Sequence, residues 1–141
     1  MANASGAASG NNLNYNDGVD FDNGAANSGT ARTPSINLSG LSAANQATMS
    51  FWCRYQTETT GTSYDQRWIR IYNATTNAQV YQGQFAGTAA APLTCPAMNQ
   101  WHQHTFSSMP AGTFGIPIIV EFYFNSVDAG INNYQGWFID D

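Results

Sequence analysis

Hydrophobic and polar residues alternate along most of the chain after residue 30. The apolar runs are bounded by Gly, Asn, Pro and Ser, and no long stretch repeats with the 3.6-residue period of a helix. The segment 41–49, LSAANQATM, is the one place where a short helical turn remains an alternative. The pattern predicts strands at 33–38, 47–57, 66–73, 78–85, 101–108, 116–125 and 136–141. Such a series is typical of an all-β, two-sheet antiparallel sandwich.

Alternation also separates a core face from an opposite face in each predicted strand. In MSFWCRYQ, 49–56, Phe51 falls on one face and Trp52 on the other; in QRWIRIYN, 66–73, Ile69 and Trp68 divide in the same way. The expected core includes Phe51, Ile69, Ile71, Val120, Phe122 and Trp137. The opposite faces carry Trp52, Arg54, Trp68, Arg70 and Tyr72, and the same alternation adds Glu121 and Tyr123.

These aromatic and arginine side chains have two interpretations. They form a ligand-binding platform for a sugar or a peptide, or they form cation–π pairs and a second apolar layer that only stabilise the sheets. Alternation predicts one common face for Trp52, Arg54, Trp68, Arg70 and Tyr72.

Composition narrows the cellular setting. Only 9% of residues are charged and there is no lysine, so Asn, Gln, Ser, Thr and Gly make up most of the polar surface. We expect an extracellular or cell-surface protein on this basis. The net charge is −5 and the arginines form no basic stripe, which argues against a nucleic-acid partner. No apolar run approaches the ~20 residues that span a bilayer, so no membrane insertion is expected.

The N-terminal residues 1–14 are mostly small and polar. Such a composition does not offset the conformational entropy lost on ordering, so we expect a flexible or strand-donating segment there. The β-sandwich domain is expected at 15–141.

The two cysteines and two histidines are the candidates for a disulfide or a metal site. Cys53 and Cys95 are either bridged or remain two buried free thiols, and both alternatives stay open. His102 and His104 in WHQHTF project from one face of a strand, as a zinc pair would. Because no third ligand lies nearby in the sequence, we expect them to be surface histidines.

No catalytic motif stands out. The only glutamates are Glu58 and Glu121, and there is neither a G-x-S-x-G elbow nor a cysteine–histidine protease signature. We therefore expect that the protein is not an enzyme.

The chain ends on GWFIDD. Trp137, Phe138 and Ile139 have the pattern of a strand entering a core, whereas Asp140 and Asp141 are poor strand residues unless a positive group holds them. The ending therefore suggests a strand that carries a ligand.

Four segments resemble a known family: TARTPSINLSG, ATMSFWCRYQTE, SYDQRWIRIYN and IPIIVEFYFNSVDAGINNYQGWFIDD. They are similar to the MAM-like modules of secreted bacterial proteins, and the likeness covers residues 16–141, with GWFIDD as its most specific element. The resemblance implies a concanavalin-like jelly-roll sandwich that is generally non-catalytic and is attached to peptidases, glycosidases or adhesins.

Related jelly-roll modules commonly hold a structural calcium ion between the beginning of the domain and its last strand. The resemblance places the corresponding carboxylates in NDGVDFDNG and at the chain end, at Asp17, Asp20, Asp22, Asp140 and Asp141. Calcium takes six to eight oxygen ligands at about 2.3 to 2.6 Å, which clustered Asp and Asn residues on glycine-containing loops can supply. A solvated acidic surface is the alternative for each cluster.

Two classes of function follow. The first is a calcium-stabilised extracellular binding or adhesion module that recognises a glycan or a cell-surface protein. The second is a structural subunit of an extracellular filament that self-associates by strand addition. The second is raised by the ending, because in the resembled family the chain continues beyond the two aspartates.

Overall fold

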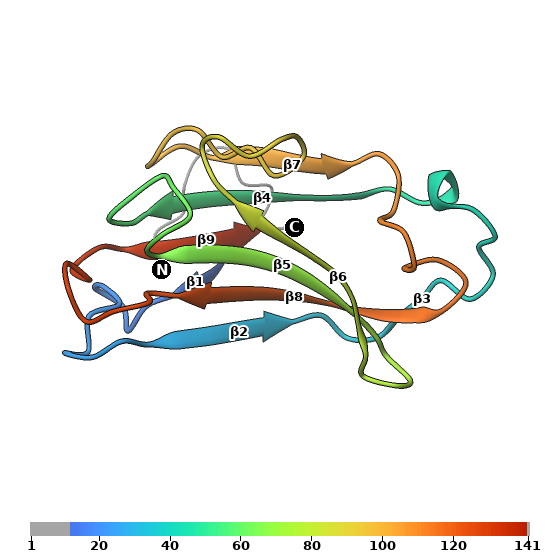
Figure 1. Cartoon of the computed structure of the whole chain (residues 1–141), viewed down its shortest axis with the longest axis horizontal. Helices are drawn as coiled ribbons and strands as arrows, with labels where there is room; N and C mark the ends of the chain where they lie inside the picture. The colour runs from blue at the N-terminus through green and yellow to red at the C-terminus, as the bar shows by residue number, and fades with distance from the viewer. Residues whose placement is uncertain (1–11, 141) are drawn as a thin grey trace.

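The computed structural model describes residues 12–140, which form two antiparallel sheets packed face to face (Figure 1). The predicted two-sheet antiparallel sandwich is therefore confirmed. The first sheet has the strand order β1–β9–β4–β7, with bounds Leu13–Tyr15, Gly136–Asp140, Met49–Gln56 and His102–Phe106. The second sheet has the order β2–β8–β5–β6, with bounds Ser28–Arg32, Pro117–Asn125, Gln66–Asn73 and Gln79–Phe85.

Smaller elements complete the fold. The short strand β3, Ile36–Asn37, pairs with β8, and the turn left open in 41–49 is a 3₁₀ helix, η1, at Ala44–Gln46. The part of the chain that the structure describes contains no helix with the length and apolarity needed to cross a membrane.

Two strands, β1 and β2, are not predicted by the sequence pattern. Strand β2, SGTAR, has only small or polar residues and relies on its pairing with β8. Strand β1 pairs with β9 and contains Leu13 and Asn14, which the sequence assigns to the N-terminal segment. The sheet therefore begins before residue 15. Residues 1–11 of that expected segment lie outside the described part of the chain.

The core lies between the two sheets. Phe51, Ile69, Ile71, Val120 and Trp137 are buried as expected. Phe122 is half-buried, yet its ring lies 4.9 Å from that of Phe51 and 5.8 Å from that of Trp137. Because these contacts join β4 and β9 to β8, one aromatic core holds the sheets together. Full burial of a large apolar side chain contributes about 1.5–3 kcal/mol.

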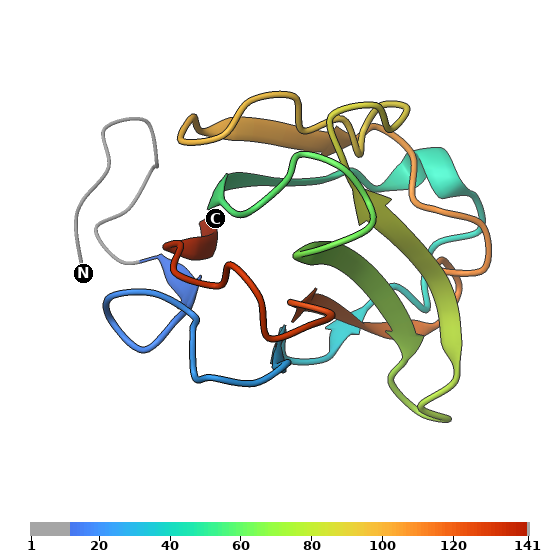
Figure 2. The same cartoon turned by 60° about the vertical axis from the view of Figure 1, so that its left-hand side comes forward.

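The second sheet curves, so that β5 and β6 bend around one side of the molecule (Figure 2). On the opposite side, the edge strands β1 and β2 approach each other, and the Tyr15 hydroxyl of β1 donates to Asn27 Oδ1 beside β2 at 2.8 Å. A groove of about 210 Å³ between these edges reaches Phe122 and Phe124, and this opening explains why Phe122 is only half-buried.

Candidate functional site on the second sheet

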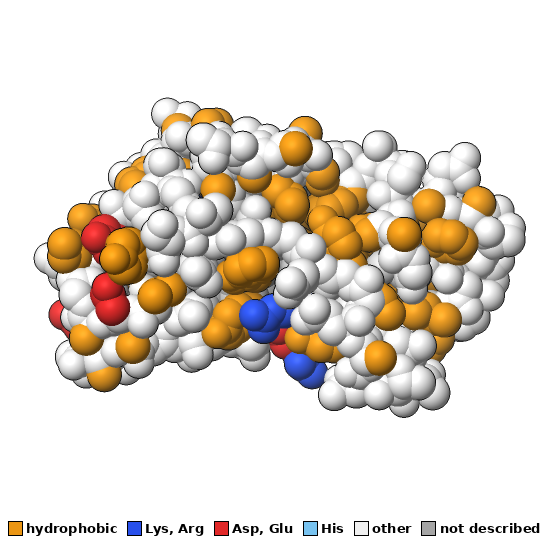
Figure 3. All heavy atoms as spheres, viewed as in Figure 1, with side chains coloured by type: hydrophobic (Ala, Val, Ile, Leu, Met, Phe, Trp, Pro, Cys, Tyr) orange, Lys and Arg blue, Asp and Glu red, His pale blue; other side chains and the backbone are white. Residues whose placement is uncertain are grey.

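Two rows of side chains run across the outer face of the second sheet. The strand register places the members of each row side by side on β2, β8, β5 and β6. The first row is Arg32, Glu121, Arg70 and Gln82, and the second is Thr30, Tyr123, Trp68 and Gln84. Figure 3 shows arginine and acidic side chains together near the middle of this face, among hydrophobic ones. We call this surface the outer face.

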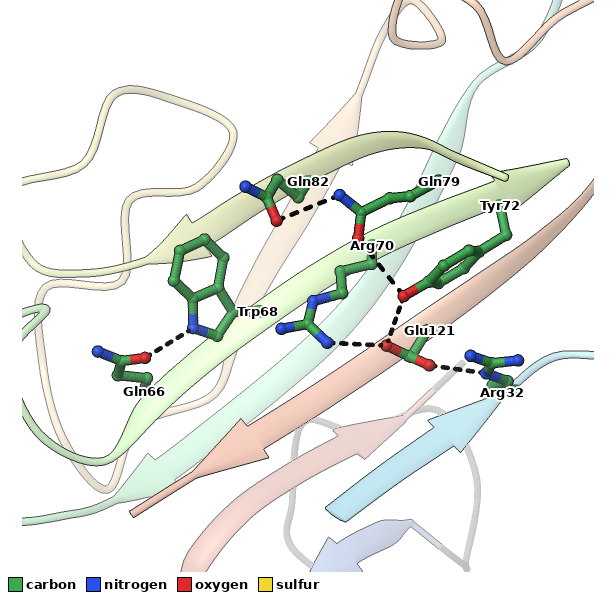
Figure 4. Close-up of polar contacts among 8 residues, drawn as sticks. All are labelled: Arg32, Gln66, Trp68, Arg70, Tyr72, Gln79, Gln82 and Glu121. Atoms are coloured by element: carbon green, nitrogen blue, oxygen red, sulfur yellow. Dashed lines mark hydrogen bonds and ion pairs between the residues drawn. The ribbon is translucent and has the colours of Figure 1, made fainter. Parts of the chain in front are cut away.

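Glu121 organises the charges of the outer face. Its carboxylate accepts a hydrogen bond from Arg32 Nε at 2.7 Å and forms an ion pair with Arg70 Nη1 at 3.3 Å. The Tyr72 hydroxyl, also 3.3 Å from Glu121, completes the cluster (Figure 4). The carboxylate is 2% exposed, so the two guanidinium groups compensate the cost of burying it. The hydrogen bond that Arg32 donates to Glu121, and the negative charge of that carboxylate, raise the pKa of Arg32.

Aromatic rings surround this ion cluster. The Arg70 guanidinium carbon lies 3.8 Å from the centre of the Tyr123 ring, and that of Arg32 lies 4.8 Å from the Tyr72 ring. Trp68 is half-buried and its indole N–H donates to Gln66 Oε1 at 3.2 Å. Figure 4 shows Trp68, Arg70 and Tyr72 on the same side of β5. The outer face therefore combines ring surfaces with fixed donors and acceptors.

The predicted set of five site residues is divided by the structure. Trp68, Arg70 and Tyr72 lie on the outer face, together with Glu121 and Tyr123 as alternation suggested. The expected common face is wrong for Trp52 and Arg54, because β4 belongs to the first sheet and its outward side chains point away from the second. Alternation assigns a side chain to one face of its strand, but it does not say which sheet the strand joins.

Arg54 has its own surroundings on the first sheet. Its guanidinium carbon lies 4.8 Å from the centre of the Phe138 ring, and Nη2 donates to Gln135 Oε1 at 2.6 Å. Trp52 is paired in register with Asp140 on β9 and with Gln103 on β7. These residues contribute nothing to the outer face.

The structure also separates the acidic residues expected to bind calcium. Strands β1 and β9 are antiparallel, and Tyr15 at the end of β1 lies opposite Trp137 near the beginning of β9. The loop that follows β1 therefore starts beside the beginning of β9, whereas Asp140 lies at the other end of β9. The loop carboxylates instead bind their own backbone: Asp17 Oδ1 accepts from Val19 N, and Asp20 and Asp22 make the equivalent Asx turns. Asp141 lies outside the described residues, and calcium binding stays a prediction.

A different group of potential metal ligands lies inside the sandwich. Among residues 12–140, the only group of three or more His, Cys, Asp or Glu residues with ligand atoms within 4.8 Å of one another is Cys53, Cys95 and His104. Both cysteines are free thiols and all three residues are buried. The expectation of surface histidines is therefore wrong for His104, which is 2% exposed because alternation along β7 directs it inward with Phe106.

The pKa values of the two adjacent thiols shift in opposite directions. Burial raises the pKa of Cys53 well above its usual range, whereas the hydrogen bond from Cys53 lowers the pKa of Cys95 to about 5. One proton shared by the adjacent sulfurs accounts for both directions, because the thiol that keeps the proton stabilises its neighbour as a thiolate.

Arg67 is a buried cation that sequence reasoning missed. Its guanidinium carbon lies 4.0 Å from the centre of the Tyr55 ring, and Nη1 donates to Thr57 Oγ1 at 2.8 Å. Burial lowers its pKa, as expected for a cation removed from water. The signal was present in the sequence, since alternation places residue 67 on the same face as Ile69 and Ile71.

Comparison with known proteins yields no relative of this chain. No protein-family model matches it, no curated protein matches it, and no solved structure matches it. The resemblance to MAM-like modules is thus supported only at the level of a two-sheet antiparallel sandwich.

Proposed function

We propose that the protein is a non-catalytic, extracellular binding module that recognises a glycan through the outer face. The observation that carries this proposal is the row of Thr30, Tyr123, Trp68 and Gln84, in which two aromatic rings lie between polar side chains across four strands. Sugar rings present apolar C–H groups that pack on aromatic rings, and their hydroxyls pair with amides and charged groups.

The neighbouring row supplies directional and charged groups. Glu121 is held by Arg32 and Arg70, so two positive charges meet one negative charge and one positive charge is in excess. Gln82 is exposed beside Arg70, and the Gln79 amide nitrogen donates to it at 3.3 Å. A surface whose polar groups are already oriented loses less entropy on binding than a flexible one. The sequence resemblance to MAM-like modules, which are attached to peptidases, glycosidases or adhesins, agrees with the same proposal.

Trp68→Ala tests the proposal. The wild-type protein is applied to a glycan array, and the best sugar is then titrated while tryptophan fluorescence is recorded. We expect the variant to bind about tenfold more weakly, because stacking on an aromatic ring contributes about 0.5–1.5 kcal/mol beyond the area that the ring buries. Its melting temperature should change little, since Trp68 is only half-buried.

Trp52→Ala is the matched control, since Trp52 is also half-buried but lies on the other sheet. It should bind the sugar with unchanged affinity. Equal losses in the two variants, or full binding by Trp68→Ala, would contradict a site on the outer face.

Self-assembly by strand addition is a second candidate function. The groove between the edge strands β1 and β2 favours it, because Leu13, Phe122, Phe124 and Ile139 line an apolar opening of about 210 Å³ beside an edge strand of only three residues. The occupant in this proposal is an extended segment of a second copy of the chain, whose backbone would pair with β1 or β2.

A further inference from the structure

We infer that Cys53, Cys95 and His104 form a buried site for a thiophilic metal ion, Zn²⁺ or Cu⁺. The ligands come from three separate segments: β4, the loop between β6 and β7, and β7 itself. The two sulfurs lie 3.6 Å apart, and Cys53 Sγ lies 3.1 Å from His104 Nε2. Two thiolates with one imidazole are a ligand set that prefers these ions over Ca²⁺ or Mg²⁺.

The spacing of the ligand atoms suits such an ion. With Zn–S near 2.3 Å and Zn–N near 2.0 Å, two sulfurs in a tetrahedral site are about 3.8 Å apart, and a sulfur and a nitrogen about 3.5 Å. The two separations given above lie within about half an ångström of these values. A small opening of the cluster is therefore enough to admit the ion.

A hydrogen bond fixes the orientation of the histidine. His104 Nδ1 lies 2.6 Å from the Pro92 carbonyl oxygen, which can only accept, so Nδ1 carries the proton. The lone pair of Nε2 is consequently directed at Cys53. Histidines that bind metals have the same arrangement, with one nitrogen on the ion and the other donating to a carbonyl or carboxylate.

The charges of the ion and of nearby Arg67 balance the negative charges of two thiolates. With a neutral imidazole, two thiolates cancel the charge of Zn²⁺ and leave one negative charge with Cu⁺. Arg67 supplies a positive charge nearby: its guanidinium packs on Tyr55, and the Tyr55 hydroxyl donates to the Cys95 carbonyl at 2.8 Å. A buried complex of zero or compensated charge avoids most of the desolvation cost of an isolated ion.

A pocket of about 540 Å³ lies between β7 and the loop that carries Cys95, and its lining includes His104, Pro92 and Thr94. Both cysteines are fully buried and do not line this pocket, so uptake of an ion requires a local opening of the loop that carries Cys95. In an oxidising compartment, adjacent free thiols tend to form a disulfide, and a bound ion would occupy both sulfurs and oppose that reaction.

The test uses the whole chain, reduced and handled without oxygen. Zn²⁺ and Cu⁺ are added in separate arms, excess ion is removed, and the metal content is measured by mass spectrometry. We expect one ion per chain in at least one arm, and the arm that keeps its ion against a competing chelator identifies the metal. X-ray absorption of that sample should show two sulfurs and one nitrogen from the protein around the ion, with water as a fourth ligand in the Zn²⁺ arm.

Variants assign the ligands. Cys95→Ser and His104→Gln should each weaken binding by at least about 100-fold, since each removes a direct ligand. His102→Gln is the control, because the other histidine of β7 bonds the Ala97 carbonyl instead, at 2.7 Å, and should leave affinity within about threefold. If the ligand variants do not fold, the absorption spectrum of the wild-type protein still decides the outcome.

Three results would overturn the inference. The first is a reduced protein that retains neither ion. The second is a bound ion without sulfur ligands. The third is a Cys53–Cys95 disulfide, seen as the loss of two hydrogens by mass, in a protein that binds no ion after reduction.

Discussion

Asp65 is a fully buried carboxylic acid immediately before β5. Its Oδ2 accepts a hydrogen bond from the Glu58 backbone N–H at 2.6 Å. Burial raises the pKa of Asp65 to about 6, from 3.8 for an exposed aspartate, although the bond from Glu58 opposes the shift. The folded protein therefore binds this proton more tightly than the unfolded chain does.

This shift predicts how stability depends on pH. Because the folded pKa is the higher one, the contribution of Asp65 to the free energy of unfolding is fully present below about pH 4 and is lost as the pH rises through about 6. A shift of about two units corresponds to at most about 3 kcal/mol. Urea denaturation of the wild type at about pH 5 and about pH 7.5 should show part of this loss.

Asp65→Asn should remove that part of the pH dependence. The amide oxygen can still accept from Glu58, but the side chain no longer becomes a buried charge. The difference between variant and wild type isolates the contribution of Asp65 from that of every other titrating group. An unchanged pH dependence in Asp65→Asn would show that another group is responsible.

At the scale of elements, the β1–β9 pair depends on a glycine. Gly136 has a φ of +82°, and a Cβ there would collide with the Tyr15 carbonyl oxygen on β1. Gly136→Ala should therefore lower the free energy of unfolding by about 2 kcal/mol or more, from backbone strain and from separation of β1. Chemical denaturation measures the loss.

Gly40→Ala is the control for this element, since Gly40 has open space around it and no positive φ. Its stability should stay within about 0.5 kcal/mol of the wild type. If the two glycine variants were equally stable, β1 would contribute nothing measurable to the fold.

The outer face combines residues that alternation predicts with one that it does not. The alternation of β5 and β8 places Trp68, Arg70 and Glu121 on one side of their strands. Arg32 was not predicted, because β2 has no hydrophobic alternation to mark it as a strand. Its position beside Glu121 depends on the pairing of β2 with β8, two strands far apart in sequence.

At the scale of the whole molecule, size in solution separates the two proposed functions. A binding module should elute as a monomer of 15.2 kDa over a wide range of concentration. A self-assembling subunit should form dimers or larger species that grow with concentration, because its edge groove binds a second copy. Size-exclusion chromatography with light scattering makes the measurement.

The comparison should be repeated after chelation, so that an effect of bound metal is recognised. Large assemblies that persist at low concentration would contradict the monomeric module. In that case, only the Trp68→Ala experiment would test sugar binding by the outer face.

The sequence by itself determined the all-β class, most strand positions and which side of each predicted strand faces the core. Each of these is a local property, since the period of two follows from the geometry of one extended chain. Only the tertiary structure decided which strands are neighbours. It placed Trp52 and Trp68 on different sheets, and it brought Cys53 to Cys95 and His104, which lie 42 and 51 residues away along the chain. Such contacts depend on pairing and packing between distant segments, which no local pattern records.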